Sequence, residues 1–529
     1  MRPGTTDSEG RKLADSIEQS GTEQRPVFKG RATVYSRFDE IDESNVLAAL
    51  DECLPFFAVN VAQISYLWRY YKGVQPILSR EKKVREDIKN TVVENHAQEV
   101  VAFKLGYQLA EPLQYTCRMQ EPKAGGESEA GEGESAYDAT LAQVNELNTL
   151  MFAEDKASCD RDLFEWMCVC GIGFRMCEAD SAEDAEDGGA PFEIHTLDPR
   201  ETFVARSRSY HHRVVMSVWV GVDSDDEKLY NVYTGKMWFL VKNQKIVDKR
   251  PITYGANPIV EYQLNNARMG VFEPVLGLLD AINLIESNRL DDIEQTVQAL
   301  MKFINCEVDK DEFLEMLDLG AVKVRTIDPN FKSDIQMLTT DLDQTGAQTA
   351  KDDLYQSVVN ICGMPNRNGQ GGSTSDTGAA VLLRDGWTLA ESHAKSYELQ
   401  FKRFERDFLR VALAICRQSA GCEIDLRIRD IELAFNRRNY ENILIKSQVL
   451  TTMLASGKIH PLLAFQSCGM FTDPDAAYRL SQEYAAERGT GLAEAALAVA
   501  SDQALGETVN AGSQAAVPEP GEGDSAIAA

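Results

Sequence analysis

The spacing of apolar residues predicts one unusually long helix in the second half of the chain. Residues Thr377–Gln418 include no proline, and their apolar side chains recur in alternating steps of four and three. These side chains are Leu383, Trp387, Ala390, Ala394, Tyr397, Phe401, Phe404, Phe408, Val411 and Ile415. Such steps place side chains on one face of a helix, so one face is predicted to be buried. At about 1.5 Å per residue, this helix would be roughly 60 Å long.

Helical spacing recurs in several other segments. Further helices are predicted within Val46–Lys72, Glu86–Gly106, Leu141–Met167, Phe272–Phe303, Glu312–Leu319 and Asp352–Cys362, with a three-helix unit across Tyr440–Glu487. Gly73 and Gly363 directly follow two of these helices, as glycine commonly does at a helix C-terminus.

Two regions have strand-like patterns instead. Strands of an antiparallel meander are predicted at Arg213–Val222, Lys228–Thr234 and Met237–Lys242, which are rich in β-branched and aromatic residues. Shorter strands are predicted at Ile304–Val308, Val322–Ile327, Ile335–Leu338 and, by alternation, Cys422–Phe435. The acidic stretch Asp180–Gly189 is predicted to be a hairpin tip. Separate runs of helices and strands indicate an α+β fold.

A Gly/Ser/Thr/Asn-rich loop, Gly363–Gly378, precedes the long helix and contains the candidate functional residues. They are Asn366, Arg367, Asn368, Gly369, Gln370, Gly371, Gly372, Ser373, Thr374, Ser375 and Asp376. A loop before a helix N-terminus can bind an anion, so a nucleotide-dependent enzyme with a phosphate cradle is one interpretation. A P-loop, however, needs a lysine, and none lies between Lys351 and Lys395. Asp376, at the place of the phosphate, is better suited to cap the helix.

No other segment carries a catalytic or metal-binding pattern. The six histidines lie in neither a GxSxG nor an HExxH context. The spacing of Cys159, Cys168, Cys170 and Cys177 lacks a CxxC pair, and the nearest following histidine is His195, which favours buried thiols over zinc. We therefore expect no catalytic residue, no metal and no cofactor.

The formal net charge of −29 over 529 residues argues against tight binding to nucleic acid. More than half of the excess lies in Glu121–Asp138, Glu178–Asp187 and Ser501–Ala529, which are poor in large apolar residues. No apolar run is long enough to span a bilayer, and the N-terminus lacks a signal-peptide core, so we expect no membrane partner.

Arginines on the long helix leave two interpretations open. Arg403, Arg406 and Arg410 could contact DNA. Ion pairs with Glu405 and Asp407 on the same helix are the simpler interpretation.

Four segments in a fixed order carry a resemblance to a known family. They are YYKGVQPIL (Tyr70–Leu78), NTVVENHAQEVVAFKLGYQLAEPLQY (Asn90–Tyr115), NPIVEYQLNNARMGVFEPVLGLLDAINLIESNRLDDIE (Asn257–Glu294) and CGMPNRNGQGGSTSDTGAAVLLRDGW (Cys362–Trp387). They resemble segments of the portal proteins of tailed double-stranded DNA bacteriophages, in the form found in long-tailed siphophages. The resemblance covers roughly Asn45 to Glu487, and the acidic insertions at 121–138 and 180–189 have no counterpart in it.

The resemblance implies a division of the chain into portal parts. These are a flexible N-terminal arm (1–45), a wing (46–271), a stem helix (272–303), a clip (304–345), a second stem helix (346–362), a tunnel loop (363–378), a long wing helix with a strand (379–437), a helical crown (438–487) and a disordered tail (488–529).

It also implies a ring, usually of twelve copies, at one vertex of the virion capsid. Double-stranded DNA would be packaged and ejected through this ring, after assembly in the host cytoplasm. The implied partners are other copies of the chain, the terminase large subunit, the head–tail adaptor, and the major capsid and scaffolding proteins. DNA must slide through such a channel without strong phosphate binding, and a moderately acidic body suits that requirement.

Overall fold

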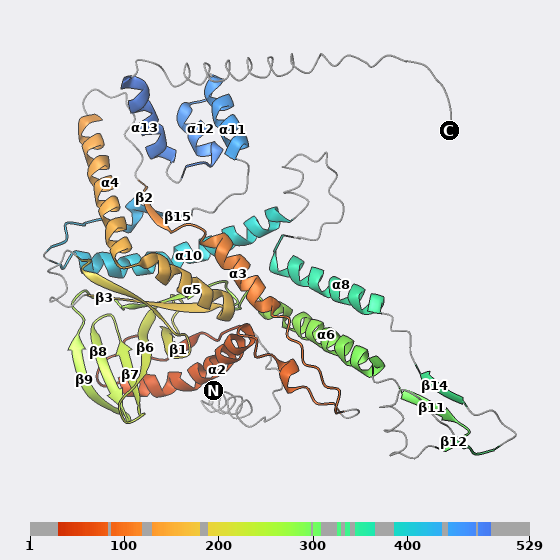
Figure 1. The fold of residues 1–529 in the computed structure, drawn as a ribbon. Helices are drawn as coiled ribbons and strands as arrows, with labels where there is room; N and C mark the ends of the chain where they lie inside the picture. Colours follow the sequence, from red (N-terminus) through yellow and green to blue (C-terminus); the bar gives the residue numbers. More distant parts are fainter. Residues whose placement is uncertain are drawn as a thin grey trace, which may run out of the picture. The chain divides into compact units, whose positions relative to one another are not determined.

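The computed structural model describes residues 30–82, 86–118, 130–179, 189–297, 300–307, 325–328, 334–338, 344–365, 386–419, 421–435, 443–456, 458–471 and 474–487. The chain divides into two compact units. The first unit comprises Met1–Tyr107, Thr149–Gly372 and Leu382–Ile428, and the second comprises Gln108–Asn148, Ser373–Val381 and Arg429–Ala529. Both units combine helices with mainly antiparallel strands, which confirms the predicted α+β class (Figure 1).

A six-stranded sheet and one long helix form the first core of the first unit. The strands, in spatial order, are β1 (Val34–Ser36), β5 (Thr202–Ser207), β6 (Val214–Val222), β7 (Lys228–Tyr233), β8 (Met237–Lys242) and β9 (Lys245–Pro251). β6, β7 and β8 are the predicted antiparallel meander. Residues at helical spacing on α2 (Val46–Tyr71), among them Leu50 and Phe57, share one buried core with Phe203 of β5 and Val218 of β6.

The helix α2 is also the one described helix with the length and hydropathy of a membrane span, with a mean hydropathy of 1.3 over its most apolar window. Its buried face packs into the core shared with the sheet. Of its most apolar window, 39% is buried.

A second, three-stranded sheet carries the strands β10 (Ile259–Gln263), β3 (Ile172–Ala179) and β4 (Phe192–Leu197) in that order. The helices α5 (Lys156–Cys170) and α10 (Trp387–Cys416) pack against it. Ala179 pairs with Phe192 across β3 and β4, as expected for a hairpin. Its predicted tip at 180–189 lies, except for Gly189, outside the described residues.

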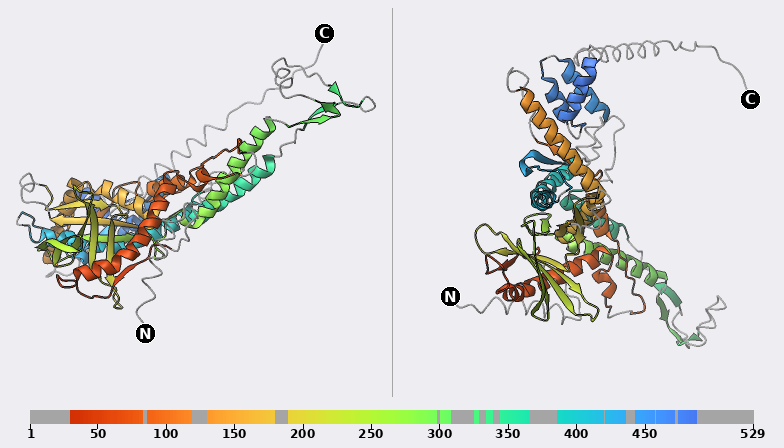
Figure 2. Two further views of the ribbon diagram at one scale, coloured as in Figure 1. Left: turned by 90° about the horizontal axis from the view of Figure 1, so that it is seen from below. Right: turned by 90° about the vertical axis from the view of Figure 1, so that its left-hand side faces the viewer.

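Two helices of the first unit run side by side and lead to short strand pairs (Figures 1 and 2). They are α6 (Leu276–Val297), entered through the 3-10 turn Glu273–Val275, and α8 (Gln344–Cys362). The strand pairs are β11 (Leu300–Ile304) with β14 (Asp334–Leu338) and β12 (Cys306–Glu307) with β13 (Arg325–Thr326).

Residues 90–94, which we call the strap, run in extended form along α6. Backbone N–H groups of alternate strap residues donate hydrogen bonds to side chains four residues apart on α6: Asn90 to Asp291 (2.8 Å), Val92 to Ser287 (2.9 Å) and Glu94 to Asn283 (2.8 Å). Two extended residues advance about 6.6 Å and four helical residues about 6 Å, so the two repeats match. The three accepting side chains are buried, and the strap satisfies them.

The second unit contains a helical bundle and a small sheet. The helices α11 (Ile443–Ala455), α12 (Pro461–Cys468) and α13 (Pro474–Glu487) confirm the predicted three-helix unit, and Phe465 and Tyr478 lie in their shared core. β2 (Gln114–Cys117) pairs antiparallel with β15 (Ile431–Ala434). Most of α4 (Ala130–Ala153) also belongs to this unit.

Two predicted helices prove shorter because tertiary contacts override the local pattern. The segment predicted as Glu86–Gly106 is helical only in α3 (His96–Gln108), since the strap before it is extended and bonded to α6. The helix predicted as Phe272–Phe303 ends at Val297, and the residues from Leu300 form β11, which pairs with β14. Pairing with a distant strand decides the conformation there.

The long helix begins ten residues later than its pattern predicts. Gly386, directly before α10, has φ +83°, so the helix cannot continue through it; residues 366–385 lie outside the described residues. From Ala390 to Ile415 the predicted apolar stripe is buried, with Tyr397 only partly so, and α10 spans 30 residues.

Two further predictions need correction in the second unit. Of the strand predicted at Cys422–Phe435, only Ile431–Ala434 is a strand, because β2 offers it four pairing residues. A helix is predicted from Leu141 onward, but α4 already begins at Ala130, within the acidic stretch Glu121–Asp138. Arg479 on α13 contacts Asp138 at 3.1 Å and so neutralises part of that charge.

Candidate functional site

The predicted tunnel-loop residues Asn366–Asp376 lie outside the described residues. Most of the predicted loop lies within the longer segment 366–385, and the structure describes the two ends of that segment, both in the first unit. The first end is Gly363–Pro365, after α8, and the second is Gly386, before α10, eight residues beyond the predicted loop end at Gly378.

The first end of the loop is a tight turn that only glycine fits well. Gly363 has φ +60°, its N–H donates to Asn360 O (3.2 Å), and the Met364 N–H donates to Val359 O (2.9 Å). These bonds close the last turn of α8. A Cβ atom at Gly363 would lie 2.7 Å from Nδ1 of His393 on α10. The chain therefore leaves α8 pressed against α10.

The second end is also a left-handed glycine. The carbonyl of Gly386 accepts the N–H groups of Leu389 (3.1 Å) and Ala390 (3.2 Å), which starts α10. Both ends of the segment 366–385 are thus fixed by backbone geometry.

One face of α3 holds both ends together. Lys104 Nζ donates to the Gly363 carbonyl at 3.0 Å, and the Tyr107 hydroxyl donates to Glu391 Oε2 at 2.8 Å. The rings of Phe103 and Tyr107 pack against Trp387, with centroids 6.3 Å and 5.9 Å away. We call Phe103, Lys104 and Tyr107 the α3 clamp. Residues three and four apart share a helix face, so one turn of α3 reaches both Gly363 and the start of α10.

Lys104 is a buried cation whose ammonium group caps α8. Burial lowers its pKa to about 8, although the nearby thiols of Cys362 and Cys168 act in the opposite direction. Near pH 7 the amine remains charged and faces the C-terminal end of α8, where a cation is favoured by the helix dipole. Burial, and then Lys104, also lower the pKa of His393, so the imidazole against Gly363 is neutral at pH 7.

The replacement Gly363→Ala tests the tightness of this turn. We expect it to lower the free energy of unfolding by about 1–2 kcal/mol, since an L-residue is strained at positive φ and the new methyl group meets His393. Gly346→Ala is the matched control on the same helix. A Cβ there meets nothing within 4 Å, and alanine favours the helix by about 0.5–1 kcal/mol. Thermal unfolding should therefore shift in opposite directions, and equal shifts would contradict the packed turn.

A buried ion-pair cluster fixes α10 on the three-stranded sheet. Arg175 on β3 and Lys156 on α5 both contact Glu405, at 3.2 Å and 3.0 Å, and both also pair with Asp160. The Tyr262 hydroxyl donates to Glu405 at 2.6 Å. Each of the four charged side chains is at most 5% exposed, so each charge depends on its partners.

The sequence pattern predicted the partners of α10 only in part. Arg410 does pair with Asp407 on its own helix. Glu405, however, turns to Arg175 and Lys156 instead of its helical neighbours. The sequence held one sign of this buried ion pair: Arg175 is a charged residue inside the otherwise apolar run Ile172–Cys177.

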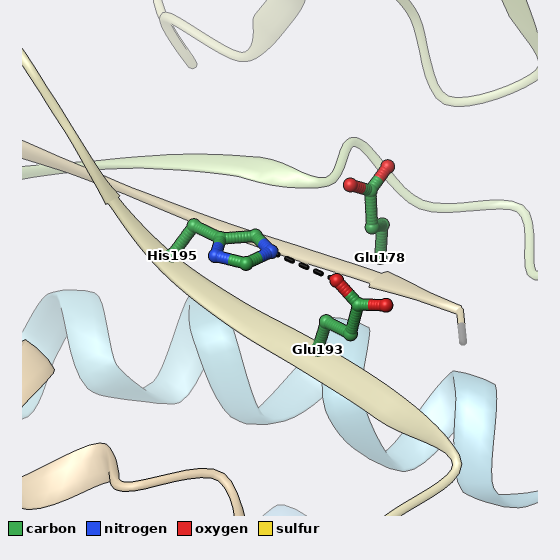
Figure 3. Close-up of side chains that lie close together, drawn as sticks. All are labelled: Glu178, Glu193 and His195. Atoms are coloured by element: carbon green, nitrogen blue, oxygen red, sulfur yellow. Dashed lines mark hydrogen bonds and ion pairs between the residues drawn. The ribbon is translucent and has the colours of Figure 1, made fainter. Parts of the chain in front are cut away.

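Within the described residues, the side chains that could share a metal ion are Glu178, Glu193 and His195, not the four cysteines considered above (Figure 3). Glu178 and Glu193 are opposite each other on β3 and β4, and His195 Nε2 lies 2.9 Å from Glu193 Oε2. Their ligand atoms lie within 4.8 Å of one another. His195 is exposed, and its hydrogen bond to Glu193 accounts for this contact without an ion.

The cysteines instead lie among apolar residues. Cys168, Cys170 and Cys177 are buried, and burial raises the pKa of their thiols. They are therefore neutral near pH 7.

Comparison with known proteins decides the family. A sequence model of the family described as phage portal protein, SPP1 Gp6-like, matches residues 51–490. The chain belongs to the phage portal protein family. This portal protein also matches a solved structure titled the neck of an empty GTA particle computed with C6 symmetry. The identity is 12% over 77% of this chain and 94% of that chain, and the TM-score is 0.41. No curated protein matches the chain.

The family confirms the resemblance carried by the four sequence segments. Portal proteins form a structural, non-enzymatic family, and this member is a component of the phage particle that belongs to the head–tail connector. The matched region contains both loop ends, the α3 clamp and the paired helices α6 and α8.

Proposed function

We propose that this portal protein forms a ring of twelve copies at one capsid vertex, through which double-stranded DNA enters and leaves the head. The observation that carries the proposal is the family match over residues 51–490. The protein acts without catalysis and without a cofactor. Its neighbours in the capsid are the major capsid protein and, during assembly in the host cytoplasm, the scaffolding protein.

The parts of the ring follow the order of the elements. The paired helices α6 and α8 serve as the stem, and the strand pairs β11–β14 and β12–β13 form the clip. The clip docks the terminase large subunit during packaging and the head–tail adaptor afterwards. The helices α11, α12 and α13 form the crown.

The loop Gly363–Gly378 lines the narrowest part of the channel in this proposal. Support comes from the α3 clamp, which fixes both ends of the segment 366–385 to one helix face. The loop contains no lysine and one arginine, so it offers little charge to neutralise phosphates. Weak phosphate binding keeps the friction on sliding DNA low.

The ring itself is tested by imaging the purified chain at moderate salt. Each copy carries a formal charge of −29, so salt that screens repulsion should favour assembly. Rings with a central hole are expected. Monomers that persist at every salt and protein concentration would contradict the proposal.

Deletion of Gly369–Ser375 tests the role of the loop. We expect rings to assemble normally, because Gly363 and the first turn of α10 keep their contacts with α3, while packaged or retained DNA falls strongly. The measurement is the DNA content of heads assembled with the variant, and deletion of residues 511–517 from the C-terminal tail is the length-matched control. Heads that fill normally would refute the loop assignment. Binding of ATP or GTP to the wild-type chain would favour a nucleotide-dependent enzyme instead.

A further inference from the structure

A basic cleft opens on the first unit between three elements. It has a volume of about 350 Å³ and lies between the turn that joins β5 to β6, the strand β10 and the helix α10. Its polar lining consists of Arg206, His211, His212, Arg213, Asn257, Glu261, Asp407 and Arg410. Three arginines therefore converge on one cavity of a strongly acidic chain.

The floor of the cleft is held rigidly by buried charges. Glu261, 4% exposed, accepts hydrogen bonds from Arg206 (3.1 Å) and Arg268 (2.5 Å). Burial alone would raise the pKa of Glu261, but Arg268 and Arg206 outweigh it and lower the pKa to about 2. Arg206 is therefore committed to Glu261, and it fixes one wall of the cleft.

The rim of the cleft carries groups suited to an interface. Within the described part of the chain, the guanidinium of Arg213 has no ion pair, and its side chain is exposed. Tyr210, in the same turn, is 85% exposed, with its ring centroid 3.6 Å from that of His211. The opposite rim is Arg410, whose ion pair with Asp407 is half exposed. Exposed tyrosine and arginine are the residues that most often anchor protein–protein interfaces.

We infer that this cleft receives a carboxylate-bearing surface of a second copy of the chain. The inference rests on the proposed ring, in which every subunit must offer two different patches to its neighbours. Charge complementarity favours this occupant, because the remainder of each copy is acidic while the cleft rim is basic.

Charge reversal at the rim tests the inference. In the double variant Arg213→Glu/Arg410→Glu, we expect the protein concentration needed for half-assembly to rise by about 10- to 100-fold, because like charges then face each other. Sedimentation of the full chain over a concentration series, at one moderate salt, gives this value. Arg250→Glu is the matched control: Arg250 is exposed on β9 and pairs with Asp248 two residues away. It should assemble like the wild type.

A single variant guards against misfolding of the double variant. Arg213→Glu breaks no ion pair of the described chain, so it should keep the wild-type thermal unfolding and still weaken assembly.

The outcomes separate this inference from the proposed function. If the wild type and the variants form rings at equal protein concentrations, the cleft is not a subunit interface, and the inference is overturned. The portal proposal stays in place. A wild type that never assembles would overturn both. Unchanged assembly together with lost binding to a short DNA duplex would identify the cleft as a nucleic-acid site and overturn the inference.

Discussion

Replacing Arg175 by methionine is expected to lower the free energy of unfolding of the first unit by about 3–5 kcal/mol. The guanidinium of Arg175 is fully buried between Asp160 and Glu405. Without it, two buried carboxylates share the single ammonium of Lys156, and one negative charge is left uncompensated. Urea unfolding of the monomeric chain, followed by tryptophan fluorescence, measures the change.

Two further variants show whether the loss comes from charge balance. In Arg175→Met/Glu405→Met, the pair Lys156–Asp160 remains and is neutral as a whole, so part of the lost stability should return. Arg410→Ala removes a half-exposed ion pair from the same helix and should change stability by less than about 1 kcal/mol. Glu405→Met alone completes the cycle: a loss in the double variant that equals the sum of the losses in the two single variants would contradict a coupled cluster.

The second large effect is a dependence of stability on pH that belongs to Lys104. Its pKa is about 8 in the folded chain and 10.5 when exposed, so between these values the unfolded chain binds more protons. Unfolding free energy therefore rises with pH across this window and gains up to about 3 kcal/mol, since deprotonation removes the cost of a buried charge. Below pH 8 the full cost of burying the charge is present.

The variant Lys104→Met isolates this contribution. Tyrosines and cysteines titrate in the same range, so the quantity to measure is the difference in unfolding free energy between wild type and variant. The variant should be the more stable at pH 7, by an amount that shrinks toward pH 10.5. Lys72→Met, at the exposed end of α2, is the control for the removal of a surface lysine. A difference that stays constant with pH would mean that folding does not lower the pKa of Lys104.

Local patterns in the sequence predicted the elements whose contacts are near in sequence. The ends of α2, the meander β6–β8 and the three helices α11–α13 follow from periodicity and turn residues, and the structure confirms them. The strap and β11 were assigned to helices. Their conformations depend on partners about two hundred residues away for the strap and about thirty to forty for β11, which no local window contains.

The sequence also predicted only part of the candidate site. Gly363 was expected to end α8, and it does so. Gly386 is predicted to lie inside the long helix because the apolar stripe continues on both sides of it, from Leu383 to Trp387. Lys104 gave no signal, since a lysine in a helical pattern normally points to solvent. The contacts of Lys104 with Gly363 depend on the packing of α3 against α8, so only the structure reveals the α3 clamp.

The strap along α6 restricts how the lengths of two segments can vary. The three hydrogen bonds use every second residue of the strap and every fourth residue of α6. Inserting one residue between Asn90 and Glu94 would turn the donors away from α6, and inserting one residue between Asn283 and Asp291 would rotate the acceptors by about 100°. Among related chains, insertions and deletions should therefore be absent from both segments, or occur together as two residues in the strap with four in the helix.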